Sequence, residues 1–240
     1  HQREALDQII PALKTMPRST AVMACGTGKT MVALWTAERL GARRILVLMP
    51  SLALVKQTLE EWSRWTRWGD DYRFMCVCSD PKVAGGIEAW VLGPMETGFP
   101  VSTEPEQVTN FLAKSDNAVQ VIYSTYQSAH IVAGGLPSGQ SFDLAILDEA
   151  HKTAGRDGTK FTFALKDENI PIDRRLFLTA TARHYNIRKR NKDGDFDVAS
   201  MDNEAVYGPV AYRLPFAEAA KRDIICDYKV LISVVTRSEL

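Results

Sequence analysis

An eight-residue segment, residues 23–30, combines two glycines with a lysine and two threonines directly after an apolar run. The glycines let successive backbone N–H groups surround a phosphate, and the helix expected to follow adds the favourable end of its dipole. The lysine places a positive charge on the β and γ phosphates, and the last threonine offers its hydroxyl to Mg²⁺. Met23 replaces the glycine that opens the general form of this motif. The pattern predicts a nucleoside triphosphate site formed by Gly26, Thr27, Gly28, Lys29 and Thr30.

Two adjacent carboxylates, Asp148 and Glu149, follow a second apolar run at residues 144–147. Because ligand chemistry in parallel sheets gathers at the carboxyl ends of the strands, we expect both carboxylates at the same edge as the phosphate-binding segment. A carboxylate there can hold hydrated Mg²⁺ together with Thr30, and a second one can orient the attacking water. We assign Asp148 to the metal and Glu149 to the water. The competing interpretation is a solvated acidic pair at a helix start, stabilised by the helix dipole.

Short apolar runs alternate with longer amphipathic stretches along the chain, which predicts an α/β fold of parallel strands joined by crossover helices. The runs expected to be buried strands are residues 21–24, 45–49, 74–77, 119–123, 144–147 and 176–178. Helices are expected at residues 29–40, 52–67 and 104–114, the last with Thr103 as its N-cap. Residues 211–214, 216–221 and 228–235 predict a further strand, helix and strand.

The 240 residues carry 29 basic and 29 acidic side chains, and 45% of them are hydrophobic. This balance excludes a disordered chain, which lacks the apolar surface to offset its ordering entropy. No apolar run is long enough to span a bilayer, so we expect a soluble cytoplasmic protein without a membrane partner. The four cysteines lack disulfide or zinc spacing, and we interpret them as reduced thiols. The net charge of zero gives no indication of a polyanionic partner.

The sequence Asp-Glu-Ala-His at residues 148–151 is the signature of the DEAH-box proteins. Together with Gly-Thr-Gly-Lys-Thr and Thr-Ala-Thr at residues 179–181, in that order, it resembles the first motor lobe of a superfamily 2 helicase or translocase. The resemblance covers nearly the whole chain and implies a three-layer, RecA-like P-loop NTPase domain that uses ATP and Mg²⁺. The residues that it implies for catalysis are Lys29, Asp148 and Glu149. The residues that it implies for coupling the γ phosphate to the nucleic-acid track are His151, Thr179 and Thr181.

The resemblance extends to segments that touch the nucleotide base and the nucleic acid. Gln2 occupies the place of the family's adenine-reading glutamine, whose amide can pair with an adenine edge. Residues 48–57 and 123–128 resemble strand-contacting segments, and the contacts expected there are Pro50, Ser51, Ser124, Thr125 and Gln127. Ordinary capping at strand-to-helix turns is the alternative for these residues. The basic run at residues 174–192 is either a solvated face or a phosphate-tracking surface.

We expect residues 1–202 to form the helicase ATP-binding domain and residues 203–240 to lead toward a second RecA-like domain that this chain lacks. The abrupt start and end of the sequence indicate a piece of a longer protein. Because the family supplies its transition-state arginines from the second lobe, the chain alone should hydrolyse ATP slowly. The tail from residue 207 resembles the connection between the lobes of bacterial helicase-like proteins, including restriction enzymes that translocate on duplex DNA.

The favoured function is the ATP-binding lobe of a bacterial DNA helicase or double-stranded DNA translocase, in restriction-modification or phage defence. Its partners would be nucleic acid, with duplex DNA favoured, and the second lobe. A DEAH-type RNA helicase shares the same ATP chemistry and differs in its track. A P-loop kinase would lack the Asp-Glu-Ala-His and Thr-Ala-Thr pair. Lys29, Asp148 and Glu149 argue against a nucleotide-gated nucleic-acid-binding module without efficient hydrolysis.

Overall fold

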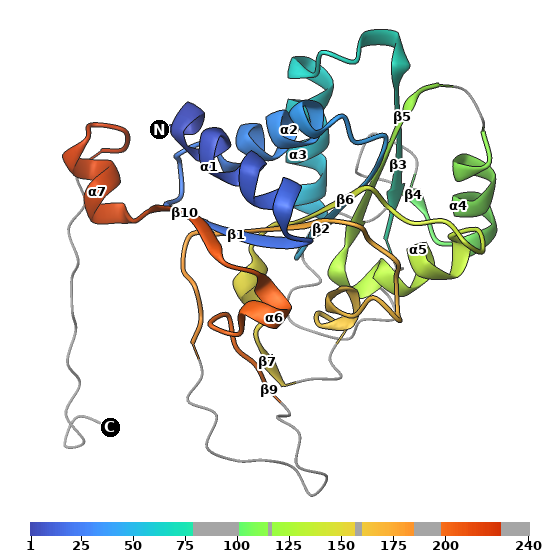
Figure 1. The fold of residues 1–240 in the computed structure, drawn as a ribbon. Coiled ribbons are helices and arrows are strands. Elements are labelled where there is room, and N and C mark those ends of the chain that lie inside the picture. The colour runs from blue at the N-terminus through green and yellow to red at the C-terminus, as the bar shows by residue number, and fades with distance from the viewer. Residues whose placement is uncertain (79–100, 115–116, 157–159, 185–197, 227–240) are drawn as a thin grey trace, which may run out of the picture.

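The computed structural model describes residues 1–78, 101–114, 117–156, 160–184 and 198–226. Its centre is an eight-stranded sheet in the order β10-β1-β8-β6-β2-β5-β3-β4, in which every pairing is parallel (Figure 1). The strands are β1 (Arg18–Met23), β2 (Arg44–Met49), β3 (Tyr72–Val77), β4 (Val101–Ser102), β5 (Val119–Thr125), β6 (Leu144–Leu147), β8 (Arg175–Thr179) and β10 (Val210–Leu214). Two short strands, β7 (Gly155–Arg156) and β9 (Val198–Ala199), form a separate antiparallel pair.

Helices cover both faces of the sheet, which makes the fold three-layered (Figure 1). One face packs against α1 (Gln2–Thr15), α2 (Lys29–Leu40), α3 (Leu52–Trp65) and α7 (Phe216–Lys221). The other face packs against α4 (Pro105–Leu112), α5 (Ala129–Gly135) and α6 (Glu204–Tyr207). The short 3₁₀ turns are η1 (Gly69–Asp71), η3 (Tyr126–Ser128), η4 (Ala150–Thr153) and η5 (Phe163–Leu165). Within the described ranges, no helix is long and apolar enough to cross a membrane.

Each face of the sheet has its own apolar core. In β2, Ile45 and Val47 belong to the core under α1, α2 and α3, whereas Leu46 and Leu48 belong to the core on the opposite face. Successive side chains of a strand point to opposite faces, so a strand covered on both sides must be apolar throughout. This is why the buried strands read as continuous apolar runs in the sequence.

The α/β parallel-sheet fold predicted from the sequence is confirmed, and so are its principal strands and helices. The predicted N-cap Thr103 is wrong, because α4 begins at Pro105 and Glu104 is its N-cap. Residues before proline are held in extended conformations, and Glu104 has φ −114° and ψ 128°. The helix expected to reach residue 67 ends at Trp65. The expected strand at 228–235 lies outside the described residues.

The segment expected to lead away from the domain begins inside its sheet. Strand β10 pairs in parallel with β1 and forms one edge of the sheet, and α7 follows it. Gly208, just before β10, lies so close to the backbone of Arg18 and Ser19 that a Cβ atom there would collide with it. The boundary after residue 202 and the connecting role of residues 203–240 remain predictions.

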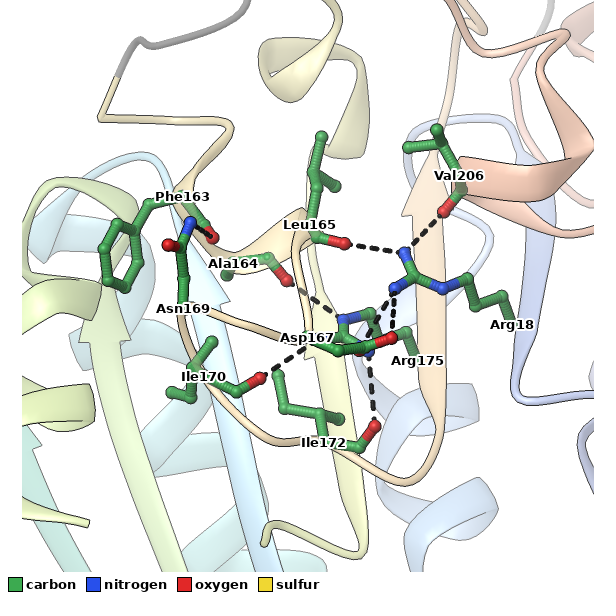
Figure 2. A network of polar contacts seen from close by, with 10 residues as sticks. All are labelled: Arg18, Phe163, Ala164, Leu165, Asp167, Asn169, Ile170, Ile172, Arg175 and Val206. Carbon is green, nitrogen blue, oxygen red and sulfur yellow. Dashed lines mark hydrogen bonds and ion pairs between the residues drawn. The ribbon is translucent and has the colours of Figure 1, made fainter.

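An ion-pair network around the buried Arg175 closes the end of the sheet opposite the carboxyl edge (Figure 2). Arg175, the first residue of β8, is 1% exposed and donates to three backbone carbonyls and to Asp167. Arg18, the first residue of the neighbouring β1, shares Asp167 over 3.1 Å and donates to the carbonyls of Leu165 and Val206. These bonds satisfy the charged groups and fasten the 160–174 connection and α6 to the sheet.

This network corrects part of the interpretation of the basic run at 174–192. Arg175 is buried, and Arg174 donates to the carbonyl of Leu13 in α1 over 2.9 Å. Burial and the nearby Arg18 lower the pKa of Arg175 to about 10, so its guanidinium still carries its charge at neutral pH. Arg175 therefore serves the fold and is inaccessible to phosphates, while Arg174 is partly exposed and helps to fix α1. Residues 185–192 of the run lie outside the described residues.

Candidate nucleotide site and nucleic-acid interface

The segment between β1 and α2 turns sharply at two glycines. Gly26 and Gly28 have φ values of 79° and 82°, in the left-handed region that side chains disfavour. The Thr27 hydroxyl donates to the carbonyl three residues earlier over 2.7 Å, which fixes the turn internally. Lys29 donates from Nζ to the Met23 carbonyl at the strand end, over 3.3 Å. The lysine and the start of α2 therefore converge where a phosphate would lie.

Gln2 lies directly against this loop. A Cβ atom at Gly28 would displace the end of the Gln2 side chain, and the φ of 82° at this position favours glycine. His1 reaches the same loop, because its Nε2 is 3.0 Å from the Thr27 carbonyl oxygen. The first turn of α1 thus brings the Gln2 amide next to the predicted phosphate site. Its contact with adenine remains a prediction.

Strand order explains how distant sequence segments meet at this edge. Strand β8 lies between β1 and β6, so the residues that follow these three strands emerge side by side. The phosphate loop follows β1, Thr179 ends β8, and Asp148 follows β6. Because the strands are parallel, all three groups lie at the carboxyl edge, as the sequence predicted.

Asp148 is a partly buried residue at this edge. Its backbone N–H donates to the Leu48 carbonyl over 2.9 Å, while its Oδ1 is buried and has no hydrogen-bond partner among the described residues. Burial, and then the negative charge of Glu149, raise the pKa of Asp148 to about 6, although the positive charge of Lys29 acts against this rise. A buried carboxylate oxygen without a donor and near a lysine matches a position where a cation would complete the charge balance.

The residues at this edge fit a bound Mg²⁺. Among the described residues, no three His, Cys, Asp or Glu side chains gather into a metal-binding cluster. Mg²⁺ in phosphate-transferring sites takes one or two protein ligands and completes its shell with water and substrate phosphates. Asp148 and Thr30, the second residue of α2, supply that number of protein ligands.

Glu149 has an unusual backbone conformation. Its φ is 48°, in the left-handed region that few residues other than glycine adopt. Its Oε2 lies 3.2 Å from His151 Nδ1, and both side chains are mostly buried. Backbone strain of this kind persists where the surrounding contacts hold it, and it is concentrated at functional sites.

His151 links the acidic segment to the end of β8. Its Nδ1 is 3.0 Å from Thr179 Oγ1, which donates its own proton to the Thr181 carbonyl over 3.0 Å. Since that hydroxyl has a single proton and the Glu149 carboxylate can only accept, these contacts require the tautomer with a proton on Nδ1, which Thr179 and Glu149 share. Burial lowers the pKa of His151, and the positive charges of Arg183, Lys152 and Lys29 lower it further. The negative charge of Glu149 acts in the opposite direction and raises it. The predicted coupling residues His151, Thr179 and Thr181 thus form one chain of hydrogen bonds.

The residues expected to contact nucleic acid differ in their accessibility. Pro50, Ser51 and Gln127 are partly exposed, whereas Ser124 is fully buried and Thr125 nearly so. Ser124 donates to the Thr125 carbonyl over 3.1 Å, and the Thr125 and Ser128 hydroxyls lie 3.0 Å apart. Ser51 caps α3 by accepting from the Leu54 N–H over 3.4 Å, as the capping alternative expects. A nucleic-acid strand could therefore reach Pro50, Ser51 and Gln127 without a rearrangement of the protein.

Sequence reasoning missed two groups at this edge. The Tyr126 hydroxyl donates to the Asp148 carbonyl over 2.7 Å, and no motif pointed to it, although it lies within the segment selected for strand contact. Arg222, after α7, donates to both Glu4 carboxylate oxygens over 2.9 and 3.0 Å. Ile225 then approaches Gly26 so closely that a Cβ there would lie 3.6 Å from it. The chain beyond β10 therefore returns to the phosphate loop. No local sequence pattern predicts this long-range contact.

The fold and this edge define a RecA-like, helicase-type ATPase domain of superfamily 2. The chain belongs to the family described as Type III restriction enzyme, res subunit, whose model matches residues 1–184.

Named relatives support the same class. The probable helicase A859L of African swine fever virus (isolate Pig/Kenya/KEN-50/1950) is 27% identical over 96% of this chain, which covers 23% of that protein. A second isolate of the virus, Tick/South Africa/Pretoriuskop Pr4/1996, has a probable helicase A859L with 26% identity. The chain therefore spans about a quarter of the length of these relatives.

Solved structures show the same architecture. The Type ISP restriction-modification enzyme LlaBIII, bound to DNA, matches with a TM-score of 0.78 and 29% identity over 95% of this chain and 16% of its own. A nuclease-deletion mutant of the Type ISP enzyme LlaGI, in complex with a DNA substrate mimic, matches with a TM-score of 0.71 and 29% identity. That match covers 93% of this chain and 20% of the enzyme. The domain is thus related to restriction-enzyme motors and to a viral helicase.

Proposed function

We propose that this chain binds Mg²⁺ and ATP at the carboxyl edge of its sheet and serves as the ATP-binding lobe of a nucleic-acid-dependent motor. The observation that carries the proposal is the meeting of Lys29, Thr179 and Asp148 at the ends of three adjacent strands, with His151 bonded to Thr179. Lys29 would neutralise charge on the transferring phosphoryl group. The bound Mg²⁺, held by Thr30 and Asp148, would supply further charge stabilisation.

The acidic segment supplies the groups for hydrolysis in this proposal. The Glu149 carboxylate orients the attacking water, while His151 holds that carboxylate within 3.2 Å and connects it to Thr179. Because His151 donates to Thr179, which is itself joined to Thr181, a movement of the strand end would reorient Glu149. Hydrolysis and movement along the track would be coupled through this chain.

Duplex DNA is the track that we propose, and translocation on it is the proposed activity. The support comes from relatives: LlaBIII is described as bound to DNA and LlaGI as bound to a DNA substrate mimic. The proposed setting is accordingly a bacterial restriction or phage-defence enzyme. A second RecA-like lobe, reached through residues 203–240, would supply the transition-state arginine, which is worth about 10³ to 10⁵ in rate in related ATPases.

The test measures ATP hydrolysis by the full-length protein that contains this chain, with duplex DNA, single-stranded DNA or RNA added. We expect the largest stimulation with duplex DNA and its loss in Lys29→Ala. Lys14→Ala, which removes an exposed lysine from the last turn of α1, is the matched control and should leave the rate unchanged. Stimulation by RNA alone would instead indicate an RNA helicase. Equal rates for Lys29→Ala and the wild type would exclude the proposed site.

A further inference from the structure

The Tyr126 side chain joins the turn after β5 to the acidic segment after β6. Its hydroxyl donates to the Asp148 carbonyl over 2.7 Å, and the residue is 1% exposed. The Asp148 carbonyl belongs to the peptide that leads into Glu149, the residue with φ 48°. The same bond therefore fixes the peptide from which both predicted catalytic carboxylates project.

We infer that Tyr126 is a positioning residue, which holds the Asp148–Glu149 peptide in its working orientation and passes movements of the 124–128 turn to it. The inference rests on the proposed function, because it assumes that these carboxylates serve Mg²⁺ and water. Tyr126 itself touches neither the metal nor the nucleotide in this scheme.

Neighbouring contacts leave Tyr126 little freedom. Its ring packs on Phe161 with the ring centres 5.5 Å apart, and it belongs to the apolar core on the α5 face. The peptide that it holds is fixed on its other side as well, by the bond from the Asp148 N–H to Leu48. Burial, and then the negative charge of Asp148, raise the pKa of Tyr126 well above its usual range. The hydroxyl therefore stays protonated and remains a donor.

The turn that carries Tyr126 also carries an acceptor that lacks a partner. Gln127 Oε1 is buried and has no hydrogen-bond partner among the described residues, although the residue is partly exposed. Buried polar atoms are nearly always paired, so water, a bound group or a rearrangement of the turn would complete this one. The contacts of the turn include the Thr125–Ser128 hydroxyl pair and the approach of His130 Nδ1 to the Gln127 carbonyl over 2.9 Å, so a displacement at Gln127 would move Tyr126 with it.

The test substitutes Tyr126→Phe in the full-length protein, which removes the hydroxyl and retains the ring. The matched control is Tyr123→Phe, because Tyr123 is also fully buried and its hydroxyl bonds to Tyr72 over 2.7 Å, away from the acidic segment. For each protein, kcat and KM for ATP are measured with and without duplex DNA. Active-site titration with ATP corrects the rates for any misfolded fraction, and Mg²⁺ titration reports metal affinity.

We expect Tyr126→Phe to lower kcat about 10-fold, the effect of one lost hydrogen bond, with KM within about twofold of the wild type. The Mg²⁺ affinity of the ATP complex should fall about 10-fold, as for the outer partners of other metal ligands. Tyr123→Phe should leave all three quantities near wild type. An unchanged kcat in Tyr126→Phe, or equal losses in both variants, would overturn the inference.

The two proposals fail in different ways. If the wild type shows no stimulation by nucleic acid, the proposed motor function fails, while the basal kcat still shows whether Tyr126 positions the acidic segment. If the wild type hydrolyses no ATP, the Mg²⁺ titration alone decides. If stimulation is normal and Tyr126→Phe matches the wild type, only the positioning role is refuted.

Discussion

Asp148 is predicted to lower the stability of the folded chain, because its Oδ1 is buried and has no hydrogen-bond partner within the part of the chain that the structure describes. Its pKa rises from an ordinary 3.8 to about 6 on folding, mainly through burial. One pKa unit corresponds to about 1.36 kcal/mol. The ionised Asp148 carboxyl therefore lowers the free energy of unfolding by about 3 kcal/mol at pH values well above 6. Asp148→Asn cannot ionise and should therefore stabilise the protein at pH 8.

The sign of the pH dependence follows from the raised pKa. Between pH 3.8 and about 6 the unfolded carboxyl is ionised while the folded one stays protonated, so stability falls as pH rises through this window. At pH 5 only part of this cost is present, whereas at pH 8 all of it is. Asp148→Asn should thus stabilise the protein more at pH 8 than at pH 5.

The assay is urea unfolding without Mg²⁺ at the two pH values, which gives the free energy of unfolding of each variant. Asp143→Asn is the control, because the Asp143 Oδ2 accepts from the Arg43 and Arg44 N–H groups over 2.7 and 2.9 Å. That variant should lose stability at pH 8. If Asp148→Asn also lost stability at pH 8, or gained the same amount at both pH values, the account of this buried carboxylate would be refuted.

Three further predictions concern the loop, the coupling chain and the buried arginine. Gly28→Ala should weaken ATP binding measured by calorimetry, because a φ of 82° strains any residue with a Cβ and because that Cβ would displace the Gln2 amide. Wild-type affinity would contradict the loop geometry. His151→Ala and Thr179→Ala should each lower DNA-stimulated ATP turnover. Because the two side chains share a 3.0 Å contact, the double variant should lose no more turnover than the worse single variant. Additive losses would show that the two residues act independently. Arg175→Met should lower the free energy of unfolding by about 3 kcal/mol through its lost buried bonds; a change below about 1 kcal/mol would show that the network is dispensable.

Sequence reasoning succeeded where a local pattern has one physical meaning. Apolar runs of four or five residues correspond to strands buried on both faces, and the motif residues directly after them lie at one edge. Helix α2 starts at Lys29 and ends at Leu40 as predicted, because a glycine flanks each end. The order of the strands within the sheet was not predicted, since adjacency in a sheet depends on contacts far apart in the sequence.

The remaining features depend on tertiary contacts. Helix α3 stops early because Glu38 accepts from the Arg67 N–H over 2.7 Å, which holds the following chain away from a helical path. The burial of Arg175 depends on Asp167, whose position only the folded connection defines. The sequence does not distinguish Tyr126 from an ordinary core aromatic residue, because its proposed role depends on the hydrogen bond from its hydroxyl to the Asp148 carbonyl.

The predicted site residues have unequal support from geometry. Lys29, Asp148, His151 and Thr179 meet at one edge, and Gln2 touches the phosphate loop. Ser124, by contrast, is fully buried and would need a movement of the turn to reach a nucleic-acid strand. Sequence resemblance names residues by position along the chain, whereas accessibility depends on packing around the turn.

The most direct test of the motor proposal is the ATP turnover of the full-length protein with duplex DNA, compared between the wild type and Glu149→Gln. The substitution keeps the size of the side chain and removes the charge that would orient the attacking water. We predict stimulation by DNA in the wild type, with turnover lost and ATP binding retained in Glu149→Gln. DNA-stimulated turnover that Glu149→Gln leaves unchanged would contradict the central claim.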